Sequence, residues 1–174
     1  SHQVAIEFFH LFTVFLEVTQ PALINLDLLM LAVNQIPKYL VVCVPEMIAE
    51  LVVMIKICYK NDPNFPFGHS DLFKSRLLPT VPLIMQSLLL GLLNYDKSSI
   101  TTVSQIFKLL FDLDPQNSQI LIVKMLQDLP IDLFPESEKV LILEQLGNGL
   151  KSNDQRALRS VLFFLNSNCK RRLN

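Results

Sequence analysis

Long apolar segments run through the whole chain, and each is closed by a proline or a short polar stretch. Within these segments apolar residues recur three and four positions apart, as on one face of a helix, and the alternation typical of a strand is absent. Glycine is scarce, with four in 174 residues. This pattern predicts an all-α protein.

Eight helices are expected. Prolines in first-turn positions open several of them, because the first helical amide has no partner within the helix. Pro37 is expected to end the second helix, Pro79 and Pro82 to kink the fourth, and Gly147 and Gly149 to close the seventh. The ranges are 3–18, 21–35, 45–59, 71–93, 98–112, 114–129, 135–149 and 152–171.

The first helix carries two apolar stripes, which is more than a surface helix needs. One stripe comprises Val4, Phe8, Leu11 and Phe15, and the other comprises Ile6, Phe9, Thr13 and Leu16. Helices of a solenoid must bury one face against their partner and their flanks against neighbouring pairs. We therefore expect an α-solenoid of about four HEAT-like antiparallel helix pairs, forming one segment over residues 1–174. The alternative is a plain helical bundle with a large core.

The expected pairs cover residues 3–36, 45–93, 99–129 and 135–171. Their spacing is irregular but close to the roughly 40–47 residues of two-helix HEAT repeats. The first residues have no initiator Met and no signal peptide, and Ser1-His2 resembles a truncation point or a tag scar. The chain is therefore expected to be the carboxy-terminal part of a longer array.

The charge is balanced overall but uneven along the chain. The net charge is −1, so no strong attraction to nucleic acid or to an anionic membrane is expected. Residues 150–174 carry six basic side chains against one acidic, whereas residues 1–149 carry nine basic and fifteen acidic. Prolines and acidic residues interrupt both of the longest apolar runs, which argues against a membrane-spanning helix. The three cysteines have no paired spacing, which favours a reducing compartment over a disulfide framework or a zinc site.

No residue pattern indicates catalysis or a cofactor. The three histidines are scattered, and neither a phosphate-binding loop nor a Gly-x-Ser-x-Gly motif occurs. Paired carboxylates such as Asp112 with Asp114 lie at expected helix ends, where capping explains them. We therefore expect a protein that is not an enzyme and that needs no cofactor or metal.

The basic terminal helix allows two interpretations. Arg156 and Arg159 lie on one helix face, and Lys170, Arg171 and Arg172 lie in the last turn. Cations there complement the helix dipole and give a terminal helix pair a soluble outer face. The same residues could instead bind an acidic partner.

The last 75 residues resemble the extreme carboxy terminus of the karyopherin-β nuclear transport receptors, most closely the transportin-SR and importin-thirteen branch. The resemblance lies in the helix 103–110, the cap Asp112-Leu113-Asp114-Pro115, the helix end 126–130, the acidic start Pro135-Glu136, and the terminal sequence 161–172. The upstream stretch 26–57 is similar more loosely.

The resemblance implies a superhelix of HEAT repeats that binds protein cargo under the control of the GTPase Ran. Such receptors shuttle between cytoplasm and nucleus and contact FG nucleoporins. Ran would bind amino-terminal repeats outside this chain. In the family the second helices line the concave face; here they would present Asp27, Asn34, Lys124, Gln127, Arg156 and Arg159. A helical-repeat scaffold or adaptor subunit without a transport role is the alternative.

Overall fold

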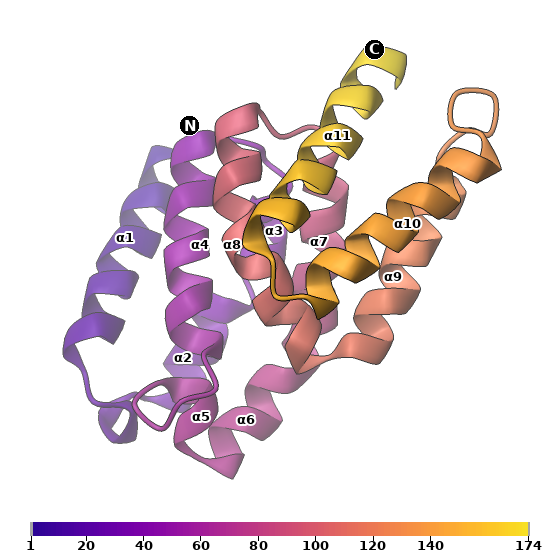
Figure 1. Ribbon diagram of the computed structural model, residues 1–174. Coiled ribbons are helices and arrows are strands. Elements are labelled where there is room, and N and C mark those ends of the chain that lie inside the picture. Colours follow the sequence, from indigo (N-terminus) through magenta and orange to yellow (C-terminus); the bar gives the residue numbers. More distant parts are fainter. Residues whose placement is uncertain (1, 174) are drawn as a thin grey trace.

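The computed structural model describes residues 2–173, and all regular structure in that range is helical (Figure 1). The longer helices are α1 (Gln3–Val18), α4 (Pro45–Tyr59), α7 (Val81–Leu92), α8 (Lys97–Leu113), α9 (Pro115–Asp128), α10 (Glu136–Lys151) and α11 (Gln155–Leu173). The shorter helices are α2 (Leu26–Val33), α3 (Ile36–Leu40), α5 (Pro66–His69) and α6 (Asp71–Leu77), with 3-10 turns η1 (Pro21–Leu23) and η2 (Leu78–Thr80).

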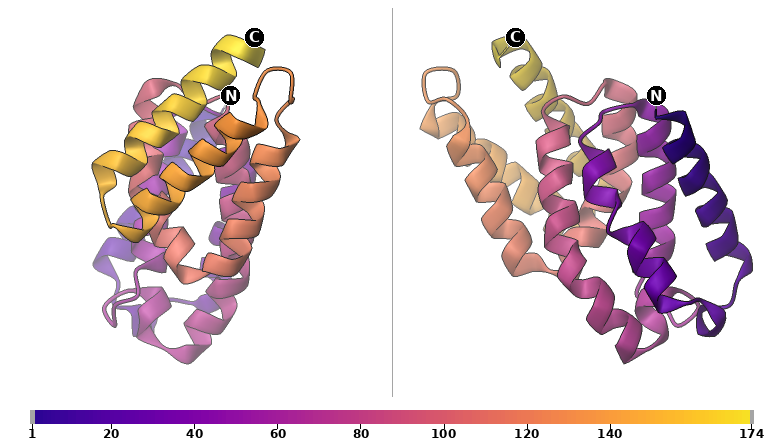
Figure 2. Two further views of the ribbon diagram at one scale, coloured as in Figure 1. Left: turned by 45° about the vertical axis from the view of Figure 1, so that its right-hand side comes forward. Right: turned by 180° about the vertical axis from the view of Figure 1, so that it is seen from behind.

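The helices pack in two layers (Figures 1 and 2). In the first layer α1 packs against α4, α4 against α8, and α8 against α11. In the second layer α2 packs against α6, α3 against α7, α7 against α9, and α9 against α10. Each of the first three segments of the chain thus places its leading helix in the first layer and its return helices in the second.

The last two helices reverse this order. The leading helix α10 continues the second layer beside α9, and α11 returns to the first layer beside α8. As a result α1, α4 and α8 run in one direction and α11 runs in the opposite direction (Figure 1). The short connection from α9 to α10 makes these two helices adjacent and antiparallel.

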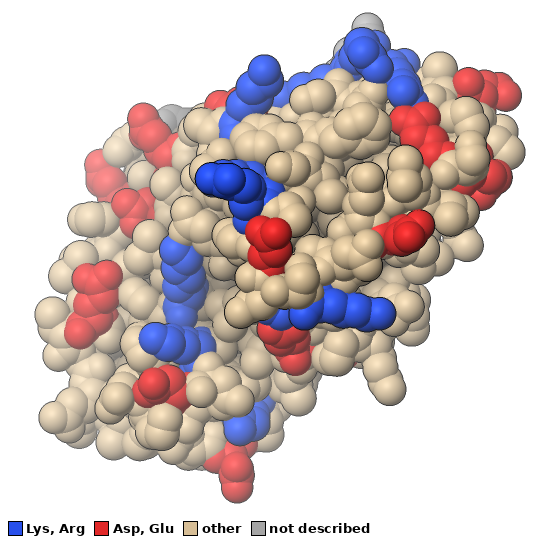
Figure 3. Space-filling view, in the orientation of Figure 1, with Lys and Arg blue, Asp and Glu red and all other residues tan. Residues whose placement is uncertain are grey.

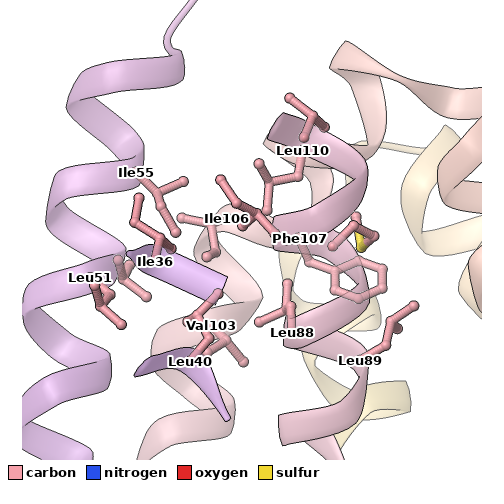
Figure 4. Close-up of a cluster of buried hydrophobic side chains, with 14 of the residues drawn as sticks. Ile36, Leu40, Leu51, Ile55, Leu88, Leu89, Val103, Ile106, Phe107 and Leu110 are labelled. Carbon is pink, nitrogen blue, oxygen red and sulfur yellow. The ribbon is translucent and has the colours of Figure 1, made fainter. Parts of the chain in front are cut away.

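The core lies between the two layers (Figure 4). Apolar side chains from α3, α4, α7 and α8 meet there, and all are buried: Ile36, Leu40, Leu51, Ile55, Leu88, Leu89, Val103, Ile106, Phe107 and Leu110. Burying each such side chain stabilises the fold by roughly 1.5–3 kcal/mol. This contact fixes the position of α7, one of the two helices that form the open groove described below.

Several predicted helix bounds are confirmed. Helices α1 and α4 have the expected ranges, and Asp114 caps α9 with its side chain while Pro115 takes the first helical position. The expected break in 71–93 is present, because η2 separates α6 from α7. Pro79 therefore lies in a 3-10 turn, where its missing N–H removes no hydrogen bond from the interior of an α-helix.

Other details of the prediction are wrong. The expected helix 21–35 is divided into η1 and α2, and Pro37 lies in the first turn of α3 rather than ending a helix. Segment 60–68 is not wholly a loop, since α5 begins at Pro66.

Two helices begin at other residues than predicted. Helix α8 begins at Lys97 rather than at 98, after Asp96, whose side chain accepts the Ser99 N–H at 2.9 Å. Helix α11 begins at Gln155 rather than at 152, after Asp154, whose side chain accepts the Ala157 N–H at 3.1 Å.

One described segment, Asp71–Leu92, is long and apolar enough to cross a membrane by length and composition alone. Half of its most apolar window is buried within the fold, as in a core segment of a globular domain.

Candidate functional surface

Helix α11, which carries most of the predicted site residues, is fixed by polar contacts to the body. The amide of Asn166 donates to the backbone oxygens of Leu92 and Tyr95, at 2.7 and 2.9 Å. At the other end of the helix, Gln155 donates to the Ser104 oxygen at 2.6 Å. These contacts hold the start of α11 against α8 and its second half against the end of α7.

The arginines in the last turn of α11 have structural partners. Arg172 donates to the Leu133 oxygen at 2.9 Å and to the Glu138 carboxylate at 2.8 Å, and it lies 4.9 Å from the centre of the Phe134 ring. Arg171 donates to the Asn168 side chain at 2.6 Å. Arg172 therefore joins α11 to the α9–α10 connection.

Lys170 is half-buried beside the start of α8. The pKa of Asp96 lies below its ordinary value, chiefly because the Ser99 N–H and the Ser98 hydroxyl donate to its carboxylate, with a smaller contribution from the charge of Lys170. Lys170 thus contributes to the electrostatic environment of the α8 cap.

Arg156 and Arg159 lie in the first turns of α11, well apart from the other basic residues. Arg156 is exposed and Arg159 half-buried, and within residues 2–173 neither forms an ion pair. At 1.5 Å per residue, Arg156 and Arg171 are separated by about 22 Å along the helix. The five basic residues of α11 therefore do not form one site.

Lys124 and Gln127 lie three positions apart on the exposed face of α9. Together with two other glutamines and two apolar residues, they form a shallow surface lined by Gln116, Gln119, Ile120, Val123, Lys124 and Gln127. Asp27 lies on α2 in the second layer, where it approaches Arg76 at 3.9 Å, and Asn34 directly follows the end of α2. The structure therefore separates the α2 residues from those of α9.

A groove opens between α7 and α9 and includes Lys124. Its volume is about 450 Å³, and its walls are mainly apolar: Gln86, Leu89, Leu90, Leu93, Leu121, Lys124, Met125, Asp128, Leu129, Pro130 and Leu173. Leu173 comes from the last turn of α11, next to Arg172. The groove thus joins α7, α9 and the last turn of α11, and Lys124 and Asp128 are its charged lining residues.

The apolar residues of this groove were not predicted from the sequence. Leu90, for example, is 56% exposed but belongs to an apolar run whose other residues enter the core. The sequence indicated only that α7 has more apolar positions than one helix face can hold. Which of these apolar residues remain exposed depends on how α7 packs against α9.

Two cysteines and two tyrosines in the core have pKa values above their ordinary range. Burial raises the pKa of the Cys58 thiol to about 12 and that of Cys169 to about 11, and it raises the pKa of Tyr59 and Tyr95 well above the ordinary range. Among the described residues no cluster of three His, Cys, Asp or Glu side chains could hold a metal ion. The open groove on α7 and α9 is a candidate site that suits binding by shape and apolar contact.

No protein-family model, curated protein or solved structure matches this chain.

Proposed function

We propose that this chain is the carboxy-terminal part of a nucleocytoplasmic transport receptor that binds protein cargo under the control of Ran. The observation that supports the proposal most is the packing order. The first-layer helices α1, α4 and α8 lie side by side in one direction, and their return helices lie side by side behind them. This is the arrangement expected of three HEAT-like pairs in an α-solenoid.

The α7–α9 groove and the exposed face of α9 supply the cargo-binding surface in this proposal. In a HEAT solenoid the second helices line the inner surface, and α7 and α9 are second helices by chain order. Lys124 and Gln127 extend from that surface, and Leu173 from the last turn of α11 completes the groove. A cargo segment with an apolar side chain and nearby acidic residues fits this arrangement.

The test uses the whole protein that contains this chain, immobilised and exposed to cell extract with Ran loaded with either GTP or GDP. We expect the set of captured proteins to change with the nucleotide on Ran. The double variant K124E/Q127E should capture the α9-dependent cargo about tenfold more weakly, which corresponds to 1.4 kcal/mol.

The matched control is K60E, a charge reversal at an exposed residue outside α9. It should leave capture unchanged. Capture that is indifferent to the nucleotide on Ran would favour a helical-repeat scaffold or adaptor subunit instead. Equal capture by K124E/Q127E and K60E would remove α9 from the cargo surface.

A further inference from the structure

The α7–α9 groove is walled by two helices, and the lining residues of each lie on one helix face. Along both helices these residues recur three and four positions apart, which places them side by side. The α7 wall comprises Gln86, Leu89, Leu90 and Leu93, and the α9 wall comprises Leu121, Lys124, Met125, Asp128 and Leu129. Because α7 packs against α9, the two faces form one furrow that follows both helices.

The apolar surface of α7 extends beyond the groove. Leu83 lies seven positions before Leu90 on the same helix face, and these leucines are 54% and 56% exposed. From Leu83 to Leu93 the stripe spans about 15 Å of helix axis, or nearly three turns. At the end of α9, Pro130 and the Leu173 side chain of α11 complete the lining. A single inserted side chain would leave most of this stripe in water, whereas a helix of three or more turns would cover it.

The backbone of the two walls favours a helical occupant. Helices α7 and α9 satisfy their main-chain N–H and C=O groups internally, so the groove has no row of free backbone groups to pair with an extended peptide. A helix brings its own backbone hydrogen bonds and needs only side-chain contact. Its ridges of apolar side chains, at three- and four-residue spacing, fit into a furrow between two helices.

The α7 wall supplies no charge to this contact. Helix α7 contains no charged residue. By contrast, acidic and basic side chains are interspersed over α4, α8 and α11, on the face shown in Figure 3. The charges that line the groove therefore come from α9 alone.

Lys124 and Asp128 are these charges, and they define the polar pattern of the occupant. Both are exposed, and within residues 2–173 neither forms an ion pair, either with the other or with a third side chain. Their four-residue spacing separates the positive from the negative charge by about 6 Å along the helix. An occupant complements both when an acidic residue lies opposite Lys124 and a basic residue lies one turn away, opposite Asp128. A segment of uniform charge is repelled by one of the two.

We propose that the α7–α9 groove binds an amphipathic helix of the cargo protein. The helix has apolar residues at three- and four-residue spacing and, on its flank, one acidic and one basic residue a turn apart. This inference rests on the proposed role of the groove as a cargo-binding surface and specifies the form of the cargo segment.

The test measures binding of two synthetic helical peptides to the whole protein by fluorescence anisotropy. Both peptides have about 18 residues, or five turns, with leucines on one face. They differ only in the order of one glutamate and one lysine, placed four positions apart on the flank. One order should bind about fivefold more tightly at low salt, because reversing it replaces two attractions by two repulsions.

The variant K124E/D128K exchanges the two charges of α9 and should invert the preference between the peptides. Both residues are exposed, so the melting temperature should stay close to that of the unmodified protein. Inversion assigns the preference to these two positions, because a difference in the helicity of the free peptides would persist in the variant.

The variant L90S should weaken binding of the preferred peptide at least about tenfold, since Leu90 lies in the groove. The matched control is L141S, which removes the same side chain from α10 at a residue that is 50% exposed and outside the groove. It should leave binding unchanged. A version of the preferred peptide with a central proline, which cannot form a continuous helix, should lose most of its affinity.

The inference is overturned by equal affinity for the two orders, by a preference that K124E/D128K leaves as it was, or by unaltered binding in L90S. Equal binding of the proline peptide would assign the groove to an extended segment. A dimer in sedimentation that L90S converts to monomer would assign it to a second copy of the chain.

These outcomes are distinguishable from failure of the transport proposal. Selective peptide binding together with cargo capture that ignores the nucleotide on Ran would overturn the transport proposal and support the helical occupant. Nucleotide-dependent capture together with equal affinity for the two peptides would do the reverse.

Discussion

At the residue scale, the polar groups inside the fold act as fixed, uncharged connectors. The Tyr95 hydroxyl donates to the Leu40 oxygen at 2.6 Å, and the Tyr59 hydroxyl is hydrogen-bonded to Thr80. Gly91 permits the Tyr95 contact, because a Cβ at that position would overlap the tyrosine ring. These buried hydroxyls lie where their bonds join segments that are distant in sequence.

Cys58 should make the protein sensitive to alkaline pH. The thiol has an ordinary pKa of 9.0 and a pKa of about 12 in the fold. Between these values the unfolded chain releases the proton and the folded chain keeps it, so the free energy of unfolding falls as pH rises. The loss from this group is roughly 1.4 kcal/mol per pH unit, and the stability is fully present below pH 9.

Thermal melting under reducing conditions from pH 8 to 11 tests this expectation. The variant C58A should lose stability at neutral pH, because removing a fully buried side-chain group leaves a cavity. Its melting temperature should nevertheless fall less steeply above pH 9 than that of the unmodified protein. Parallel slopes would show that Cys58 does not titrate on unfolding in this range.

At the element scale, the start of a helix was predicted well where a proline and an adjacent acidic residue mark the same position. Pro45 followed by Glu46 marks the start of α4, and Asp114-Pro115 marks the start of α9. The signals failed where tertiary contact determines the outcome. Gly149 lies inside α10 rather than after it. A Cβ at this position would lie 3.2 Å from the Leu158 Cα, so the glycine is explained by packing rather than by a helix end. This glycine serves the close approach of α10 and α11.

The candidate groove was less predictable than the helices. Lys124 was identified from its place on an expected second helix, but the apolar floor depends on which helices become neighbours. Leu90, Met125 and Leu173 come from three helices and meet only through the packing of α7 with α9 and of α11 with α8. Periodicity identifies which positions share a face of one helix, but not which faces of different helices remain uncovered.

Asn166 should be the main polar connection between α11 and α7. The change N166A would leave the buried oxygens of Leu92 and Tyr95 without this donor, at a cost of roughly 2–3 kcal/mol in the free energy of unfolding. Urea denaturation measures the loss. The exposed neighbour Ser167 supplies the control, since S167A should change stability by about 0.5 kcal/mol or less.

The near-isosteric change N166D separates hydrogen bonding from packing. An ionised aspartate has the same shape but donates no hydrogen bond, and it would face two backbone oxygens. N166D should therefore be at least as unstable as N166A. A stable N166D would mean that these two hydrogen bonds contribute little.

At the scale of the whole molecule, burial is uneven between the centre and the edge of the layers. Helix α4 lies between α1 and α8 and has eight buried residues among fifteen. Helices α1 and α10 form edges of the two layers and have four and five buried residues, respectively, among sixteen each. The free energy of local unfolding should therefore be higher for helices at the centre of the layers than for helices at their edges.

Hydrogen–deuterium exchange measured by mass spectrometry tests the prediction. Peptides from α4 and α7, which have the largest shares of buried residues, should exchange last. Peptides from α1, α9 and α10 should exchange first among the helices, and the α9–α10 connection should exchange early as well. In R172A the connection should exchange faster still, because its Leu133 oxygen loses the bond from Arg172. Uniform exchange across the helices would show that the two layers open as one unit.

The position of Asn166 also has a consequence for how this protein folds during its synthesis. The oxygens of Leu92 and Tyr95 receive their side-chain donor from a residue translated more than seventy positions later. Leu133 likewise receives the Arg172 donor from 39 positions further along the chain. Helices that leave the ribosome first therefore remain incompletely bonded until α11 emerges and docks. During that interval the surface that α11 later covers is exposed, and a chaperone that binds exposed helical surfaces could bind there.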